Sequence, residues 1–183
     1  MVKVSTLSEG WFLKKRNNGF LCPDRWDTDT GILRKIKREK LEIDNEHCNR
    51  VFLSYAHEDR LYTLCLHIFM RSHGIFLYVD WLFCSAFESG VDIKQNLKNE
   101  LNAAEQFLFL RTINSELQIK GNHTIRGWCA WEMGVFYTGV STKEKYYIEL
   151  YSRIDRRDKV DKSLQLDGMK KLKSISGGRL FGI

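Results

Sequence analysis

The stretch RVFLSYAHEDRLYTLCLHIFMRSHGIFLYVDW, residues 50–81, decides the fold. It opens with an apolar run of β-forming residues, 50–55, which predicts a short strand buried on both faces. The following segment, 57–74, has apolar residues at helical spacing: Leu61, Leu64, Cys65, Ile68 and Phe69. Glu58 and Asp59 fall in the first turn of this helix, and Gly74 follows its end. A second apolar run, 75–81, predicts another buried strand.

The same alternation continues along the chain. A helix is expected from about residue 91, with Ile93, Leu97, Leu101 and Ala104 on one face. The pattern then predicts a strand over 106–112, a polar loop over 113–127, a helix over 128–139 and a strand over 145–151. After it, 166–175 indicates a final helix and 178–183 a fifth strand or a loose end. We therefore expect an α/β fold, with a central parallel sheet of about five strands and helices on both faces.

Length and composition indicate one ordinary globular domain. The chain has 183 residues, of which 43% are hydrophobic and 28% charged. Residues 1–49 are polar and charged and predict an N-terminal extension that is partly helical, whereas the domain itself is expected over 50–183. We expect a cytoplasmic protein, because the sequence has no signal-peptide pattern and no apolar run long enough to span a membrane.

Neither the cysteines nor the charged residues indicate a particular metal site, disulfide framework or charged partner. The five cysteines are Cys22, Cys48, Cys65, Cys84 and Cys129, an odd number without a CxxC pair, which argues against a disulfide framework. Cys22, His47 and Cys48 do not match a common zinc-site spacing. The net charge is +6, but acidic residues interrupt the basic runs, which favours solvated faces. We expect no nucleic-acid partner, because the sequence has no recognition motif that supports one.

Three segments are expected to meet at one edge of the sheet. Ligands of open α/β sheets bind outside the carboxyl ends of the strands, where the strand order reverses. The segments that follow strands there are 54–60, 80–90 and the loop that leads to Trp128. The sequence has no GxGxxG, GxxxxGK[ST] or GxSxG pattern, so the simplest dehydrogenase, kinase and hydrolase interpretations are excluded.

One carboxylate stands among aromatic residues in the stretch RGWCAWEMGVFY, residues 126–137. Trp128 and Glu132 are four residues apart and share one face of the predicted helix, with Trp131 beside them. An adjacent indole partly desolvates a carboxylate, which raises its pKa, and it also attracts flat cationic rings. The structural alternative is that Glu132 faces solvent or caps a local hydrogen bond, while both tryptophans pack in the core.

Three segments of the chain resemble the Toll/interleukin-1 receptor (TIR) domain. VFLSYAHEDR is similar to its first signature, GIFLYVDW…SG…IKQNLKNEL to its second strand, BB loop and following helix, and WCAWEM to its WCxxE signature. The resemblance covers about residues 50–150 and keeps the order of the signatures. Arg126 and Gly127 stand where the family usually has serine, and the BB loop has no proline. These differences favour a divergent bacterial or phage-defence type over a receptor adaptor.

The resemblance implies a flavodoxin-like TIR fold and an NAD⁺ nucleosidase that breaks the nicotinamide–ribose bond. Glu132 matches the catalytic glutamate of NAD-cleaving members. The resemblance places Ser54, Tyr55 and Ala56 on the nicotinamide–ribose side, Asp80, Phe83 and Phe87 on the BB-loop side, and Trp128 or Trp131 in the pocket wall. NAD⁺ is then the substrate, and no other cofactor or metal is expected.

The resemblance also implies a product, an effector protein and a mode of assembly. Family members hydrolyse NAD⁺ or rejoin it as a cyclic or conjugated ADP-ribose signal, and in Thoeris antiphage systems that signal activates a separate effector protein. We expect self-association through TIR–TIR contacts, a phage trigger and no membrane partner. Two other classes remain open. One is a non-catalytic TIR scaffold, and the other is a nucleoside hydrolase or a deoxyribosyltransferase-like enzyme.

Overall fold

The strand–helix–strand segment folds as its pattern predicts. The computed structural model describes residues 2–3, 48–83, 92–119, 122–139, 143–150, 166 and 168–183. In it the segment forms β2 (Asn49–Ser54), the 3-10 turn η3 (His57–Asp59), α3 (Arg60–Arg71) and β3 (Ile75–Tyr78). Gly74 has a φ of +75°, a left-handed conformation that favours glycine and turns the chain from α3 into β3. β3 is shorter than the apolar run predicts, because Asp80 begins the one-turn helix α4 (Asp80–Phe83).

The central sheet has seven strands in the order β1-β8-β7-β4-β2-β3, with β9 also paired to β8. Its remaining strands are β1 (Val2–Lys3), β4 (Gln106–Thr112), β7 (Glu144–Leu150), β8 (Lys170–Ser176) and β9 (Arg179–Gly182). Strands β3, β2, β4, β7 and β8 are parallel, whereas β1 and β9 run antiparallel to β8. Numbered along the chain, the five parallel strands lie in the order 2-1-3-4-5, which is the flavodoxin-like arrangement.

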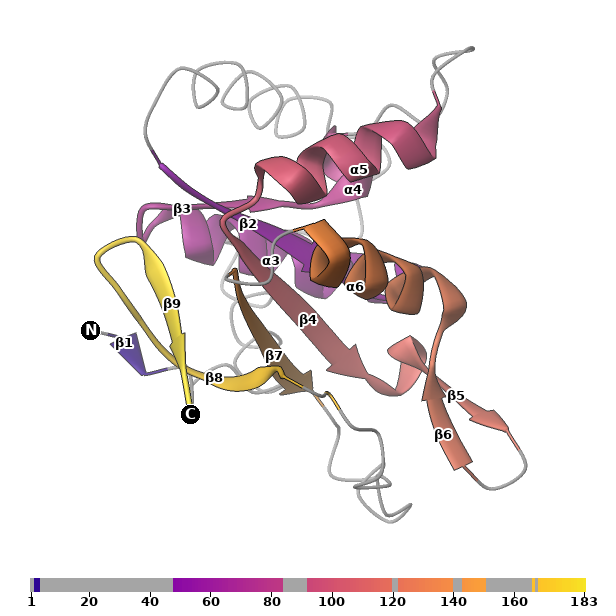
Figure 1. Ribbon diagram of the computed structural model, residues 1–183. Coiled ribbons are helices and arrows are strands. Elements are labelled where there is room, and N and C mark those ends of the chain that lie inside the picture. Colours follow the sequence, from indigo (N-terminus) through magenta and orange to yellow (C-terminus); the bar gives the residue numbers. More distant parts are fainter. Residues whose placement is uncertain are drawn as a thin grey trace.

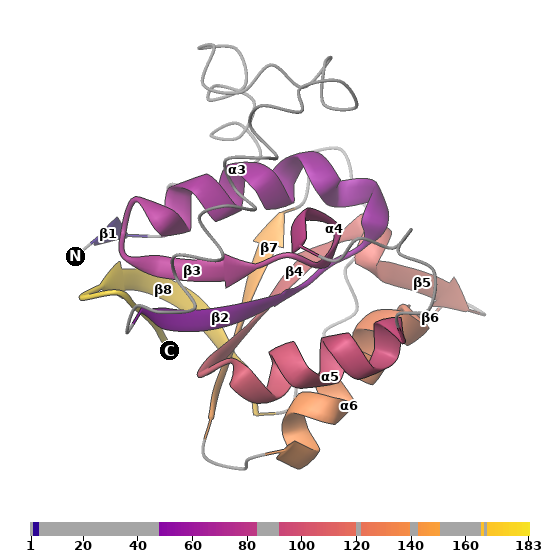
Figure 2. The same cartoon turned by 90° about the horizontal axis from the view of Figure 1, so that it is seen from above.

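Helices cover both faces of this sheet, as the alternation predicts. Helix α3 lies on one face, and α5 (Ile93–Ala103) and α6 (Gly127–Gly139) lie on the other (Figure 2). Successive strand residues point to opposite faces, so Leu108 packs on the α3 side and Phe107 on the α5–α6 side. The α3 side of the core is mainly aliphatic, and the α5–α6 side is rich in phenylalanine. Leu97 and Leu101 are buried as expected, but Ile93 is exposed together with the rest of the first turn of α5.

Two expected elements are wrong. The predicted loop 113–127 contains the 3-10 turn η4 (Ile113–Ser115) and an antiparallel pair, β5 (Glu116–Ile119) and β6 (Asn122–Ile125), which lies beside the end of β4 (Figure 1). The predicted helix over 166–175 is strand β8 instead. Over residues 171–174 of β8, buried Leu172 and Ser174 alternate with exposed Lys171 and Lys173, which is the period of a strand. Of the two alternatives given for 178–183, a strand or a loose end, the structure shows the strand, β9.

Several sequence expectations concern residues that the structure leaves undescribed. Most of the N-terminal extension, 4–47, lies outside the described residues, and so do Cys22, His47 and Cys84. Cys48, Cys65 and Cys129 are free thiols. Within the described part of the chain, no helix is both long and apolar enough to cross a membrane.

Candidate functional site

The site lies where the strand order reverses. Neighbouring strands β2 and β4 leave the sheet toward different connections, and their carboxyl ends are Ser54 and Thr112. Ligands of flavodoxin-like folds bind outside this point. Helix α6 packs on the adjoining face of the sheet through Cys129, Met133 and Phe136.

Glu132 and Ser54 meet at this point. Glu132 lies on the buried face of α6, one position before Met133, and only 3% of it is exposed. The Ser54 hydroxyl at the end of β2 is fully buried and donates a hydrogen bond to Glu132 Oε2 at 2.5 Å. A buried carboxyl group needs such a partner, because an unpaired one costs several kcal/mol. The structural alternative is therefore wrong about solvent exposure of Glu132 and about the packing of Trp128, which is exposed, and the bond to Ser54 is not local, because it joins residues 78 positions apart.

The environment of Glu132 favours its protonated form. Burial raises the pKa of this carboxyl group from 4.5 to about 8, and the negative charge of Asp80 contributes in the same direction. Hydrogen bonds from Ser54 and Trp128 lower the pKa and oppose this rise in part. A carboxyl group with a pKa near 8 exchanges protons in the range where enzymes use acids and bases.

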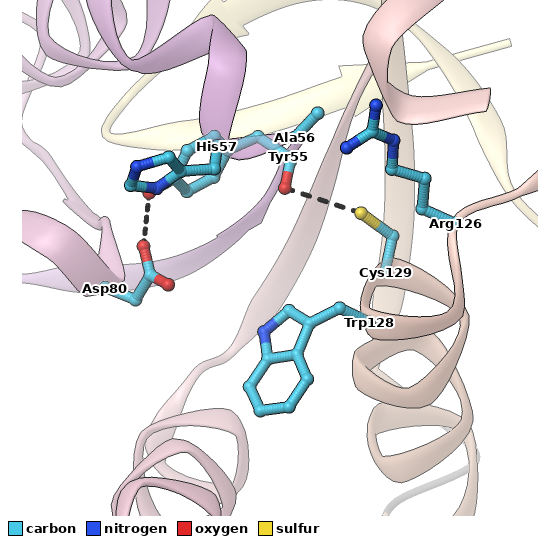
Figure 3. Close-up of a pocket in the computed structure, with 7 residues that line it drawn as sticks. All are labelled: Tyr55, Ala56, His57, Asp80, Arg126, Trp128 and Cys129. Carbon is cyan, nitrogen blue, oxygen red and sulfur yellow. Dashed lines mark hydrogen bonds between the residues drawn. The ribbon is translucent and has the colours of Figure 1, made fainter. Parts of the chain in front are cut away.

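A cavity of about 260 Å³ opens beside this carboxyl group. Its lining residues are Tyr55, Ala56, His57, Asp80, Arg126, Trp128 and Cys129. Figure 3 shows the residues that follow β2 facing those at the start of α6 across this space. Trp128 is 42% exposed, and its ring lies 5.3 Å from that of Trp131. One aromatic wall of the cavity is therefore accessible to a ligand.

Hydrogen bonds hold the opposite wall. The Tyr55 hydroxyl donates to Asp80 Oδ1, which also accepts from the backbone N–H of Trp81 at 2.6 Å. Burial and the nearby Asp80 charge raise the pKa of Tyr55, so the phenol stays neutral. Cys129 Sγ donates to the Tyr55 carbonyl at 3.4 Å, and burial raises the pKa of this thiol to about 12. A neutral buried thiol is a poor nucleophile, so Cys129 has a packing role.

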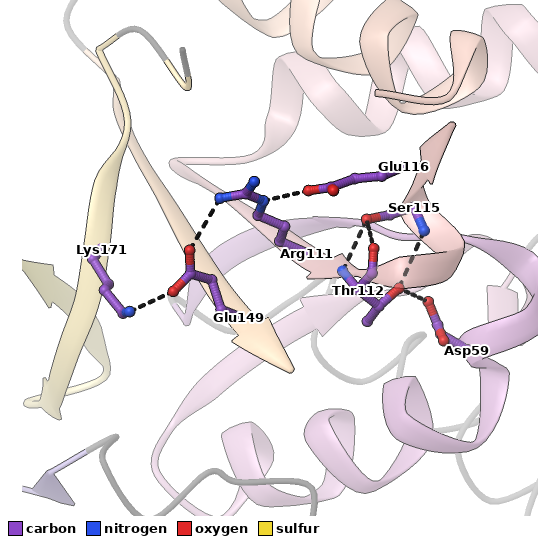
Figure 4. A network of polar contacts seen from close by, with 7 residues as sticks. All are labelled: Asp59, Arg111, Thr112, Ser115, Glu116, Glu149 and Lys171. Carbon is purple, nitrogen blue, oxygen red and sulfur yellow. Dashed lines mark hydrogen bonds and ion pairs between the residues drawn. The ribbon is translucent and has the colours of Figure 1, made fainter. Parts of the chain in front are cut away.

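The turn after β2 is braced from the far side of the site. Asp59 is buried, and its carboxylate accepts a hydrogen bond from Thr112 Oγ1 (Figure 4). It accepts a second hydrogen bond from Asn114 Nδ2. Burial raises the pKa of Asp59, and these two hydrogen bonds counteract the rise. Thr112 and Ser115 form a reciprocal capping box that fixes η4. This brace sets the position of His57, two residues before Asp59.

The structure brings together most of the expected site residues. Tyr55, Ala56, Asp80 and Trp128 line the cavity, and Ser54 and Glu132 form a hydrogen-bonded pair next to it. Trp131 contacts the Trp128 ring but is not among the lining residues.

One of the two phenylalanines expected on the BB-loop side, Phe83, is not among the residues that line the cavity. Phe83 packs against Phe76 and Tyr78 in the core. Phe87 lies outside the described residues.

Three lining residues are additional to the expected set: His57, Arg126 and Cys129. Their positions in the sequence could have identified them. His57 closely follows the strand at 50–55, and Arg126 and Cys129 flank Trp128 at the start of its helix. Ligands collect at the carboxyl edge, so every residue of these connections is a candidate, whatever its resemblance to a motif.

In comparisons with known proteins, no family model matches the chain and no curated protein matches it. Among the described residues, no group of three or more histidine, cysteine, aspartate or glutamate side chains is arranged to hold a metal ion.

Proposed function

We propose that this protein cleaves NAD⁺ between nicotinamide and ribose, with Glu132 as the catalytic carboxylate. The observation that carries the proposal is a buried carboxyl group with a raised pKa beside an aromatic-walled cavity, at the switch point of a flavodoxin-like sheet. The resemblance of three segments to TIR signatures supports the same reaction.

Cleavage of the nicotinamide–ribose bond requires no general acid from the enzyme. The nicotinamide ring of NAD⁺ is cationic and takes the bonding electron pair as it leaves, so it departs neutral without a proton donor. The ribose carbon becomes an oxocarbenium-like centre, which an ionised Glu132 stabilises. In hydrolysis a water oxygen then bonds to this carbon and loses its proton to the carboxylate or to solvent. Because the pKa of Glu132 is about 8, the rate rises with pH up to that range.

Cavity chemistry suits the departing ring. The accessible face of Trp128 attracts a flat cation through its π system, and the Asp80 carboxylate lies in the same cavity. In the free protein Glu132 is almost completely buried. The proposed reaction therefore requires Glu132 to become accessible from the cavity when NAD⁺ enters.

Hydrolysis and cyclisation remain alternative outcomes of the same bond cleavage. In the proposed role, the ADP-ribose product or its cyclic or conjugated form is a signal for a separate effector protein in antiphage defence. Mass spectrometry of the products made from NAD⁺ distinguishes these outcomes.

Nicotinamide release by purified protein tests the proposal, over a series of protein concentrations because the resemblance implies assembly. We expect Glu132→Gln to reduce release by at least about a hundredfold, because the uncharged amide does not stabilise the developing cation. Glu105→Gln is the matched control, since Glu105 is exposed and lies at the opposite end of β4. Unchanged release by Glu132→Gln removes this residue from the mechanism, and no release by the wild type at any concentration contradicts the function.

A non-catalytic interaction module is the second candidate. The observation in its favour is that Glu132 is almost fully buried and already hydrogen-bonded to Ser54, as a structural residue is. This candidate predicts no turnover of NAD⁺ together with a loss of stability in Glu132→Gln. Nucleosides supplied beside NAD⁺ test the third class, the nucleoside hydrolases and deoxyribosyltransferases.

A further inference from the structure

One arginine side chain lines the cavity. Arg126, the residue just before α6, lines the cavity and carries a guanidinium group with five N–H donors in a plane. Its Nη1 forms an ion pair with Glu58 Oε1 at 2.6 Å. Its Nε is buried and has no hydrogen-bond partner within the described part of the chain. The guanidinium group therefore has donor capacity beyond the one ion pair.

Glu58 adds little to the fold. Its side chain is 48% exposed and that of Arg126 is 37% exposed. Exposed ion pairs of this kind contribute little to stability, because water solvates the separated charges well. The backbone N–H of Glu58 and the Arg126 side chain both lower the pKa of this carboxyl group, so it is ionised at neutral pH. Its neighbour Asp59, by contrast, is buried and braces the turn.

We propose that Arg126 binds the phosphate groups of a nucleotide substrate in this cavity, and that Glu58 occupies Arg126 in the free protein as an internal competitor. The inference rests on the proposed function, because NAD⁺ carries a pyrophosphate between its two nucleosides. Phosphate oxygens accept paired hydrogen bonds from arginine, as carboxylate oxygens do. When the substrate binds, Glu58 turns to solvent, which costs little because it is already half exposed.

The arrangement of the cavity agrees with such a ligand. Trp128 offers a flat surface for a base, and Arg126 stands two residues before it at the same helix start (Figure 3). His57 also lines the cavity and offers a further nitrogen donor. A base and a phosphate group of one nucleotide therefore find complementary groups within a single cavity.

Binding of ADP-ribose, which has the pyrophosphate but no nicotinamide, tests the proposal by calorimetry. We expect Arg126→Ala to weaken binding by about tenfold or more, because a charge-assisted hydrogen bond is lost. Glu58→Gln is expected to tighten binding severalfold, because the competitor is removed. The double variant is expected to match Arg126→Ala, because without the arginine there is nothing for Glu58 to block. Adenosine, which has no phosphate, is expected to bind all variants alike.

Two controls separate local from general charge effects. Glu105→Gln and Lys98→Ala make the same charge changes at exposed positions outside the cavity lining and are expected to leave binding unchanged. The proposal is overturned if Glu58→Gln leaves binding unchanged or weakens it, if adenosine and ADP-ribose lose affinity in parallel, or if the wild type does not bind ADP-ribose.

The same experiment separates this inference from the proposed function. Binding of ADP-ribose requires no bond cleavage, so the expected pattern without NAD⁺ turnover supports the arginine site and contradicts the enzyme. If the protein turns over NAD⁺ but Arg126→Ala leaves its affinity for ADP-ribose unchanged, the enzyme is supported and the arginine site is overturned.

Discussion

At the scale of single residues, Glu132 shows how burial sets chemistry. Its position on the buried face of α6 excludes water, and Ser54 supplies one of the hydrogen bonds that make the burial tolerable. The result is a carboxyl group that is protonated at neutral pH and ionises near pH 8. Folding therefore holds a proton on this residue that the unfolded chain releases.

This retained proton predicts a pH-dependent stability. Between about pH 5 and pH 8 the folded protein binds the Glu132 proton and the unfolded chain does not, so the free energy of unfolding falls as pH rises. The slope from this one group is at most about 1.4 kcal/mol per pH unit. We expect Glu132→Gln to remove this contribution, as measured by urea unfolding at several pH values. Parallel pH profiles for the two proteins contradict the raised pKa.

At the scale of elements, the short turn η3 directs three successive side chains to three places. His57 lines the cavity, Glu58 pairs with Arg126 before α6, and Asp59 bonds to Thr112 at the end of β4. Through these contacts the turn after β2 is held both to the end of β4 and to the residue before α6. Its geometry is what brings the parts of the site together.

The brace at Asp59 can be tested by Thr112→Val. The substitution keeps the shape but removes the hydroxyl group that donates to Asp59 and accepts from the Ser115 N–H. We expect a loss of about 1–3 kcal/mol in the free energy of unfolding, because buried polar groups are left unpaired. Thr138→Val on the exposed side of α6 is the matched control and is expected to change stability by less than about 0.5 kcal/mol. Equal effects of the two substitutions would show that the brace contributes nothing.

At the scale of the whole molecule, polar side chains join segments that are distant in sequence. Arg111 on β4 pairs with Glu116 on β5 and with Glu149 on β7, which also accepts from Lys171 on β8 (Figure 4). At the other end of β4, the buried Gln106 amide bonds to Asn49, Glu144 and both backbone groups of Leu180. The C-terminal strands are therefore tied to the centre of the parallel sheet.

Gln106→Leu tests this connection. All hydrogen-bonding positions of the Gln106 amide are used, so leucine leaves the N–H and C=O groups of Leu180 unpaired in the interior. We expect a loss of about 3 kcal/mol in urea unfolding. Gln95→Leu, at an exposed position on α5, is the control and is expected to stay within about 0.5 kcal/mol of the wild type. A Gln106→Leu protein as stable as this control would contradict the role of the amide.

Sequence reasoning succeeds where the pattern is local. The bounds of β4 match the predicted strand, because a continuous apolar run is buried on both faces wherever a parallel sheet places it. The helix at Trp128 is also confirmed, and its spacing correctly predicts that Glu132 lies near an indole. It fails for β5, β6 and β8, whose polar residues become strands through pairing with one another or with β7 and β9.

The sequence by itself determined the alternation of strands and helices and placed Glu132 on one helical face with Trp128. Only the tertiary structure decided that Glu132 is buried and accepts a hydrogen bond from Ser54. It also decided that Arg126 pairs with Glu58, 68 positions earlier in the sequence, and that residues 170–176 form a strand of the sheet. The physical reason is range. Periodicity and propensity act between neighbours, whereas a hydrogen bond or ion pair depends on which distant group folding brings within about 3 Å.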